Sequence, residues 1–155
     1  MKRDSRLSGV LHVLLHAAEA DGPVTSDAMA KAMQTNPVVI RRILAGLRDA
    51  GFVRSEKGHG GGWTIARPLS EITLRDVYEA LGGPTLLAMS NRTEAPGCLV
   101  EQAVNAAMND AFAAAEALLL DRFAQVTLAA LSADFHDRLS SQTSTKETDE
   151  HDAYF

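Results

Sequence analysis

Apolar residues recur at helical spacing over the first 34 positions and predict two helices. The first is expected over residues 5–20, where five apolar side chains share one stripe: Leu7, Val10, Leu11, Leu14 and Ala18. The break at residues 21–23 reads Asp-Gly-Pro, and a short second helix follows to about Gln34. Each helix has polar N-cap candidates in front of it: Asp4 or Ser5, and Thr25 or Ser26.

A third helix is expected after a tight turn. Asn36 is a favourable N-cap, and Pro37 suits the first helical position, where its missing N–H costs nothing. Four apolar residues predict the buried face: Ile40, Ile43, Leu44 and Leu47. Three arginines fall on other sides and form a cationic face: Arg41, Arg42 and Arg48. Gly51 ends the helix, so the second and third helices predict a helix-turn-helix.

Two short alternating runs then predict a β-hairpin. The runs are residues 52–56 and 62–66, and the turn between them reads Lys57-Gly58-His59-Gly60-Gly61. A helix with an exposed basic face followed by a basic-tipped hairpin is typical of a winged helix that holds DNA.

The second half of the chain has a different pattern. Thr73 caps a fourth helix with Asp76 in the capping-box position, and Gly82-Gly83-Pro84 ends it. From about Gly97 to Phe135 the sequence reads as one long alanine-rich helix with two apolar seams: Val104, Met108, Ala111, Ala115 and Leu118, then Leu119, Phe123, Val126 and Ala130. Such a helix is too long for a small domain to cover, so we expect a homodimer.

The expected fold is therefore mainly α with a small β-hairpin wing: a winged helix-turn-helix plus a long C-terminal dimerisation helix. The expected organisation is a DNA-binding domain at residues 1–83, a connecting loop at 84–97, the dimerisation helix at 98–138 and a disordered acidic tail at 139–155.

Composition narrows the class of protein. The 155 residues are 46% hydrophobic and 23% charged, which is ordinary for a compact domain with an appendage. No apolar run approaches the ~20 residues of a membrane span, and no signal peptide is recognisable, so neither membrane insertion nor export is expected. A single cysteine excludes an internal disulfide framework and fits a reducing cytoplasm, where we expect the protein to act.

The net charge of −5 hides an asymmetry along the chain. Residues 1–67 hold ten Lys/Arg against six Asp/Glu, whereas residues 68–155 hold five against fourteen. This split indicates a basic face for nucleic acid and an acidic remainder, although surface charge also varies along ordinary helices.

No catalytic set is visible, so an enzyme is not expected. The glycine-rich turn lacks the G-x-x-x-x-G-K-[ST] pattern and lies between strands rather than before a helix. His12 and His16 stand one turn apart and could hold a metal, but such a pair is more often a packing face. We therefore predict no metal and no cofactor.

The segment from Ser5 to Gly83 resembles the IscR/NsrR/CymR (Rrf-type) family of bacterial winged-helix transcription regulators. The resemblance rests on these stretches: Ser26–Ala30, Pro37–Leu47, Ala50-Gly51-Phe52-Val53, Lys57-Gly58-His59-Gly60-Gly61-Gly62-Trp63 and Ile72-Thr73-Leu74-Arg75-Asp76-Val77. The long helix after a loop is similar too, so the likeness extends over all but the tail.

Members of this family typically hold an iron–sulfur cluster on three cysteines in the loop before the long helix. This sequence has Cys98 alone, and such clusters are normally held by several thiolates, so the resemblance does not carry the cluster over. Pro96-Gly97 places Cys98 in the first turn of the long helix, where the helix dipole would lower the thiol pKa. Cys98 is therefore a candidate sensor of oxidants or electrophiles; the alternative is a buried packing residue.

The candidate DNA contacts follow from the winged helix. Four residues in the first two turns of the third helix would reach base edges in double-stranded DNA: Asn36, Val38, Arg41 and Arg42. Lys57 and His59 at the wing tip would enter a minor groove or lie on phosphates. Four more cations would contact phosphates: Lys2, Arg3, Arg6 and Arg54. The alternative is that the two helix arginines only solvate an exposed face.

These observations favour a dimeric DNA-binding transcription regulator, a repressor on a palindromic operator, with thiol-based sensing through Cys98. One alternative is a winged-helix module for protein–protein interaction. Another is a regulator with an inert Cys98 that responds to a small-molecule inducer, for which the loop at residues 85–96 is the first place to search.

Overall fold

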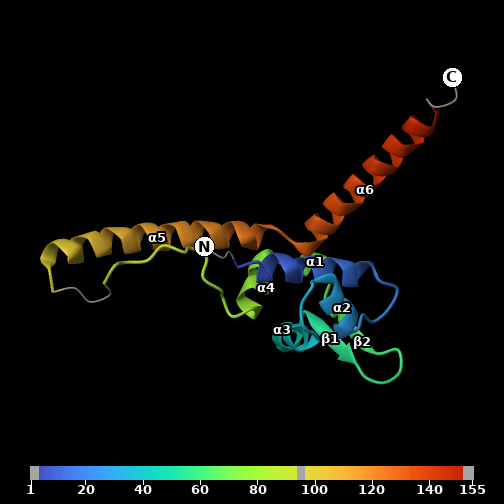
Figure 1. Cartoon of the computed structure of the whole chain (residues 1–155), viewed down its shortest axis with the longest axis horizontal. Helices are drawn as coiled ribbons and strands as arrows, with labels where there is room; N and C mark the ends of the chain where they lie inside the picture. Colours follow the sequence, from blue (N-terminus) through green and yellow to red (C-terminus); the bar gives the residue numbers. More distant parts are fainter. Residues whose placement is uncertain (1–3, 94–96, 152–155) are drawn as a thin grey trace.

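The computed structural model describes residues 4–93 and 97–151, with side chains up to residue 142. The chain is mainly helical with one two-stranded antiparallel sheet, so the predicted fold class is confirmed (Figure 1). The elements follow in this order: α1 (Arg6–Glu19), α2 (Ser26–Ala32), α3 (Pro37–Asp49), β1 (Val53–Glu56), β2 (Gly62–Ile65), the 3₁₀ turn η1 (Leu69–Glu71), α4 (Leu74–Ala80), α5 (Leu99–Gln125) and α6 (Leu128–His151).

Side-chain caps fix where the helices begin. Thr25 Oγ1 accepts from the N–H of Ala28 at the start of α2, and Asn36 Oδ1 accepts from the N–H of Val38 at the start of α3. Thr73 and Asp76 form a complete capping box on α4, as predicted. At α1, Asp4 Oδ1 accepts from the N–H of Arg6, so Asp4 supplies the acceptor there.

The core lies where α1, α3, β1 and α4 meet, and α6 adds a residue to it. Its least exposed side chains come from five elements or their flanks: Leu14, Ile40, Leu44, Leu47, Ile72, Val77 and Leu128. On α1 the buried side chains are Val10, Val13, Leu14 and Ala17. Leu7, Leu11 and Ala18 of the predicted stripe are only half-buried, so the buried face is rotated relative to the prediction.

The predicted single helix from Gly97 to Phe135 is wrong, because the chain breaks at Val126-Thr127. Val126 is extended, with φ −105° and ψ 118°, and Thr127 pairs antiparallel with Thr73. The Leu74 N–H donates to the Val126 carbonyl at 2.9 Å, and the Leu128 N–H donates to the Ile72 carbonyl at 2.8 Å. This junction attaches the start of α6 to the segment that precedes α4 and prevents the second apolar seam from forming one stripe.

α6 extends farther than expected. It is helical to His151 and so includes most of the residues 139–155 for which disorder was predicted; residues 152–155 lie outside the described residues. Arg138 Nε lies 2.7 Å from Asp134 Oδ2, one turn earlier, and such i,i+4 pairs support an exposed helix. The Ser141 hydroxyl donates to the carbonyl of Asp137, also one turn back. Local contacts of this kind favour continuation of the helix.

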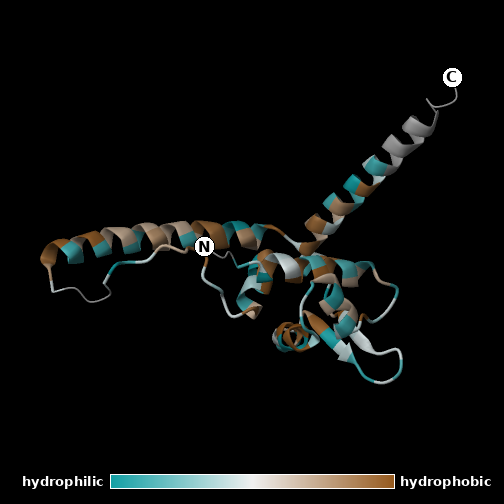
Figure 2. Ribbon diagram, viewed as in Figure 1, coloured by the Kyte–Doolittle hydropathy of each residue, from teal (hydrophilic) through white to brown (hydrophobic). Residues whose placement is uncertain are grey.

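α5 leaves the compact domain and extends away from it (Figure 1). Within the described part of the chain its only buried residue is Asn105, whose amide donates to the Thr93 carbonyl at 2.7 Å. The amide of Asn91 donates to Asn109 Oδ1, so the loop before α5 lies along this helix. Hydrophobic residues recur along α5 in the ribbon of Figure 2, and four of its large apolar side chains are exposed: Leu99, Val100, Val104 and Leu118. In the part that the structure describes, no helix is both apolar enough and long enough to cross a membrane.

Candidate nucleic-acid interface

α3 presents one face to the core and another to solvent. Ile40, Leu44 and Leu47 are 0–2% exposed, which confirms the predicted buried stripe, with Ile43 half-buried. On the other side, Val38 is 59% exposed and both Arg41 and Arg42 are exposed. The amino-terminal half of α3 therefore offers an apolar contact and two cations at its surface.

The side chains at the start of α3 are not all equally free. Asn36 uses its Oδ1 to cap the helix, at 2.8 Å from the Val38 nitrogen, which leaves its amide N–H groups as donors. Arg41 Nε donates to the Pro37 carbonyl over 3.3 Å and so lies along the first turn. Among the residues that the structure describes, Arg42 has no hydrogen-bond or ion-pair partner. Arg42 is thus the guanidinium most available to a partner.

The wing is a four-residue ladder with an exposed tip. Arg54 pairs with Thr64 and Ser55 with Trp63 in the register of β1 and β2. Lys57 and His59 lie in the exposed loop between the strands. This loop turns through glycines, and Gly58 has a φ of +95° that other residues rarely adopt.

The wing is attached to the helix-turn-helix through Trp63. The indole Nε1 donates to the Ser26 hydroxyl of α2 at 2.9 Å, and Trp63 exchanges two backbone hydrogen bonds with Val24, at 2.9 and 3.0 Å. A Cβ at Gly62 would lie 2.7 Å from the Val24 carbonyl oxygen, so this approach requires glycine. Sequence reasoning missed this contact. The signal for it is the only tryptophan of the chain, which follows a glycine run in a predicted strand.

Two of the predicted phosphate contacts carry their own counter-ions. Arg54 Nε lies 3.7 Å from Glu56 Oε1 on the same strand. Arg6 is bound by Asp4, with Nη2 2.6 Å from Oδ2. These side-chain hydrogen bonds raise the pKa of Arg6 and lower the pKa of Asp4. Exposed pairs of this kind add little stability, but they offset the local positive charge.

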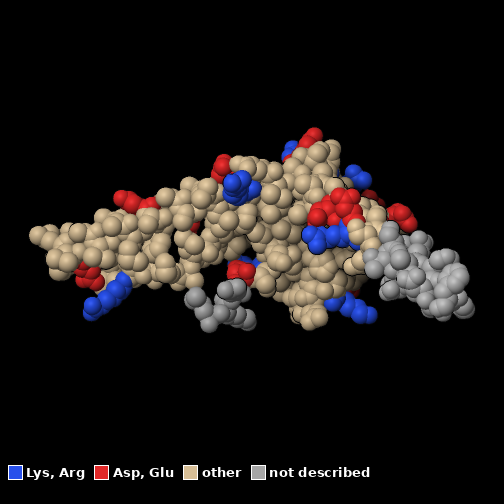
Figure 3. Space-filling view, turned by 90° about the horizontal axis from the view of Figure 1, so that it is seen from above, with Lys and Arg blue, Asp and Glu red and all other residues tan. Residues whose placement is uncertain are grey.

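The structure brings most of the predicted residues to one side of the domain. α3 and the hairpin lie together below α1 in Figure 1, whereas α1 begins on the opposite side, beside α4 and α5. Arg6 therefore stands apart from the wing tip, and Lys2 and Arg3 lie outside the described residues. The face turned away from α3 and the wing carries acidic and basic side chains interspersed (Figure 3). The candidate interface consists of Asn36, Val38, Arg41, Arg42, Arg54, Lys57 and His59.

Cys98 lies far from this interface. It is the N-cap of α5 and is exposed, at the end of α5 remote from the domain (Figure 1). The backbone N–H groups of Glu101 and Val100 lower the pKa of the Cys98 thiol. This position agrees with the predicted place at the helix start, and in the single chain the thiol is exposed.

The residues present do not fit an iron–sulfur cluster. One cysteine per chain gives two thiolates in a dimer, against the usual four ligands. Within the described ranges, no group of three or more His, Cys, Asp or Glu side chains could hold a metal ion. His12 and His16 contact each other, Nε2 to Nε2, at 2.8 Å, and His136, for which the sequence shows no partner, lies 3.2 Å from Glu19.

The helix-turn-helix, the wing attached to it and their exposed cations define a DNA-binding protein of the winged-helix class. The match to known proteins is consistent with this. Residues 3–134 match the Rrf2 family, described as iron-dependent transcriptional regulators, and the chain belongs to that family. It is a DNA-binding transcription regulator, and the family consists of regulators rather than enzymes.

Relatives at the sequence level are named as HTH-type transcriptional regulators. YwnA of Bacillus subtilis is 26% identical over 125 residues, which cover 81% of this chain and 92% of YwnA. Rv1287 of Mycobacterium tuberculosis is 32% identical over 117 residues, or 76% of this chain and 71% of that protein. YwgB of Bacillus subtilis is 33% identical over 85 residues, and this match spans only 54% of either chain.

Solved structures show the same fold at lower identity. A transcriptional regulator from Lactobacillus plantarum superposes with a TM-score of 0.71 at 24% identity, covering 93% of this chain and 98% of that one. IscR of T. potens gives a TM-score of 0.60 at 23% identity, covering 86% and 88%. CymR of B. subtilis, a global cysteine regulator, gives 0.55 at 21% identity, covering 86% and 98%.

Proposed function

We propose that the protein is a homodimeric repressor that places α3 of each protomer in the major groove of a palindromic operator and the wing tip on the adjacent backbone. The observation that carries this proposal is the exposed start of α3, with Val38, Arg41 and Arg42, beside a wing that the Trp63–Ser26 hydrogen bond fixes to the same domain. Arginine bonds the O6/N7 pair of guanine, and an apolar side chain contacts the thymine methyl group.

The two ends of the interface have different tasks. Arg42, which has an exposed guanidinium and no described partner, reads a base. Lys57, exposed at the start of the glycine-rich turn, contacts phosphate and adds affinity without sequence preference. A bidentate arginine–guanine pair discriminates by ~1–3 kcal/mol, whereas each phosphate contact adds about one unit to the salt slope.

The test is a mobility-shift titration on the promoter region upstream of the protein's own gene, at several salt concentrations. Arg42→Ala should weaken operator binding and relax base preference, whereas Lys57→Ala should weaken operator and random DNA alike and lower the salt slope by about one. Arg48→Ala is the matched control, because Arg48 is an exposed arginine at the other end of α3 and is paired with Asp49 at 3.2 Å. Unchanged DNA binding in folded Arg42→Ala and Lys57→Ala proteins would contradict the groove assignment and favour a protein-interaction module.

We propose that α5 forms the dimer interface. Its 27 residues extend from the domain, and Leu99, Val100 and Leu118 are 78%, 72% and 64% exposed in the single chain. Large apolar side chains left exposed along a helix that extends from the domain are normally covered by a partner. A second copy of α5 would cover it and would hold two α3 helices for half-sites about one turn of DNA apart, roughly 34–36 Å.

Repression follows from occupancy of the operator, since a dimer bound over a promoter competes with polymerase without any further contact.

We propose that Cys98 regulates this occupancy through its exposed thiol at the start of α5, whose pKa is lowered. One thiol per chain cannot close an internal disulfide. The available products are a sulfenic acid, a mixed disulfide with a small thiol, an electrophile adduct or a disulfide between the two chains, and the last requires the two Cα atoms to lie within about 7 Å. Any of them changes the start of the proposed dimerisation helix.

A further inference from the structure

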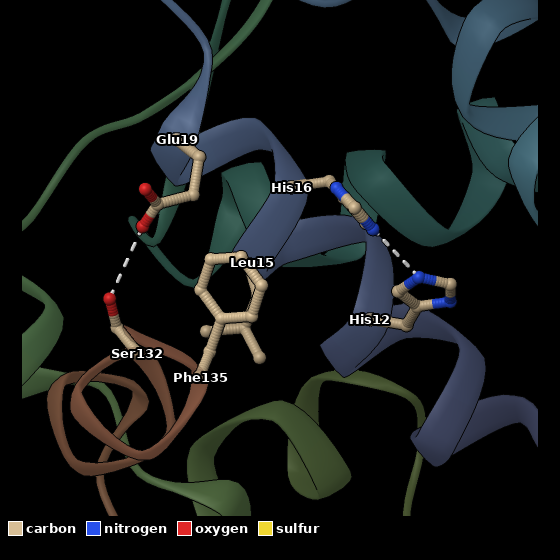
Figure 4. A pocket seen from close by; sticks show the side chains of 6 residues that line it. All are labelled: His12, Leu15, His16, Glu19, Ser132 and Phe135. Carbon is tan, nitrogen blue, oxygen red and sulfur yellow. Dashed lines mark hydrogen bonds between the residues drawn. The ribbon is translucent and has the colours of Figure 1, made fainter. Parts of the chain in front are cut away.

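A cavity of about 290 Å³ lies between α1 and α6 (Figure 4). Its lining comes from both helices: His12, Leu15, His16 and Glu19 of α1, and Ser132 and Phe135 of α6. The sequence suggested searching for an inducer site in the loop at residues 85–96, and the described part of that loop, residues 85–93, contributes none of these side chains. The cavity is at the small end of the range for ligand sites, which suits a single ring rather than a fused ring system.

The two ends of the cavity are polar. At one end, Glu19 Oε1 accepts from the Ser132 hydroxyl at 3.3 Å, and Glu19 Oε2 lies 3.2 Å from His136 Nε2. The carboxylate is therefore already bound to two groups of α6 and joins the two helices. The Glu19 carboxylate repels an anionic ligand. Because each of its oxygens already has a partner, it also offers little to a cationic ligand.

The other end is the His12–His16 pair. Their Nε2 atoms are 2.8 Å apart, so one ring donates and the other accepts, and the accepting ring is neutral. When both rings are neutral, the donating ring keeps an Nδ1 lone pair and the accepting ring keeps an Nδ1–H. With both rings neutral, the pair can therefore give or take one further hydrogen bond, as a neutral hydroxyl group does.

Apolar side chains lie between these ends. Figure 4 shows Leu15 and Phe135 between the Glu19–Ser132 contact and the histidine pair. Phe135 is 42% exposed and its ring contacts the His136 ring edge-on, so the protein itself covers the ring only in part. An aromatic ligand would contact this ring edge-to-face or with an offset, in addition to the area that it buries.

We propose that this cavity binds a small, neutral aromatic alcohol of the phenol class, with its ring on Phe135 and Leu15 and its hydroxyl toward the His12–His16 pair. The site can be tested without DNA. Its role as an effector site rests on the proposed function, because a ligand that contacts both helices strengthens the attachment of α6, and hence of the α5–α6 junction, to the domain that holds α3.

The experiment uses the full chain without DNA and p-cresol as the probe, with calorimetry and ligand-observed NMR as readouts. Toluene, which has the same shape without the hydroxyl, and benzoate, which carries the anion, are the matched ligands. Saturable binding of p-cresol, at least tenfold tighter than toluene or benzoate, is expected. Equal binding of toluene would refute the hydroxyl contact, and tighter binding of benzoate would refute the choice of a neutral ligand.

Variants locate the site. Phe135→Ala, at an exposed position, and Leu15→Phe, which fills the cavity, should each weaken p-cresol at least tenfold, and His12→Leu should abolish the preference over toluene. Met89→Ala, an exposed apolar residue outside the cavity, should bind as wild type does. Absence of saturable binding, or equal binding in folded Phe135→Ala and wild type, would overturn the site. Operator binding measured separately on the same proteins keeps that failure distinct from a failure of the DNA-binding proposal.

Discussion

The attachment of the wing to α2 makes a quantitative prediction about Trp63 and Ser26. Trp63→Phe removes the indole donor and keeps an aromatic side chain, whereas Ser26→Ala removes the acceptor and leaves the indole N–H facing the helix. The hydrogen bond is part-buried and joins residues far apart in the sequence. Its loss should therefore be measurable both in the free energy of unfolding and in the position of the wing.

The magnitudes follow from what each change leaves behind. A neutral hydrogen bond of this kind contributes about 0.5–1.5 kcal/mol, and a donor left unsatisfied in a covered site costs about 1–3 kcal/mol. Ser26→Ala should therefore destabilise by about 1–2 kcal/mol. The double variant should lose little more stability than Trp63→Phe alone, because it no longer contains an indole N–H without a hydrogen-bond partner. The resulting coupling energy is about 1 kcal/mol.

The assay is equilibrium urea unfolding of the four proteins, with operator affinity measured in parallel. Thr64→Val is the control on the same strand, since among the described residues Thr64 Oγ1 is buried without a hydrogen-bond partner. Removing that hydroxyl should be neutral or stabilising. Additive effects of Trp63→Phe and Ser26→Ala would refute the reasoning, as would a Thr64→Val change as costly as Ser26→Ala.

Four further predictions concern α5 and its N-cap residue Cys98. Leu118→Glu should place a carboxylate in the proposed apolar interface, so that sedimentation shows monomer and operator affinity falls; a dimeric variant would move the interface elsewhere. Alkylation of Cys98 by iodoacetamide should reach half its maximal rate at a lower pH than an unstructured cysteine peptide, because the lowered pKa keeps the thiolate present as the pH falls; an equal or higher midpoint would contradict this. In the same protein, diamide or a quinone should weaken operator binding for wild type and not for Cys98→Ser, and identical curves would make Cys98 inert. Protein purified without oxygen should contain no iron or acid-labile sulfide, and a brown preparation whose colour depends on Cys98 would refute this.

Local signals in the sequence predicted those parts of the fold that local interactions determine. The Asn36 and Thr73 caps, the buried stripe of α3 and the glycine-rich turn each depend on residues within a few positions of one another. The exposed start of α3 follows from the same periodicity, so the candidate DNA-contacting face could be predicted before the structure. Arg6 is the exception, because Asp4 binds it and α1 begins on the other side of the domain.

What the sequence did not predict depends on contacts between distant residues. Alanine-rich segments flank Val126-Thr127 on both sides and favour a continuous helix. The break arises because Ile72 and Leu74 provide backbone partners some fifty positions earlier in the chain. The Trp63–Ser26 bond and the contacts of Glu19 with Ser132 and His136 have the same character, since no local pattern connects α1 with α6.

The α5–α6 junction also determines how far a small rotation is transmitted. A helix of 27 residues is about 40 Å long at 1.5 Å per residue. A rotation of α5 about the paired segment at Thr73 and Thr127 is therefore amplified at the far end of the helix. Turning it there by about 5° would displace the far end by roughly 3–4 Å on that geometry. In the proposed dimer, the angle at this junction would therefore set the separation of the two domains joined through α5. Substitutions that loosen Leu128, which is 0% exposed at this point, should widen the range of operator spacings that the protein accepts.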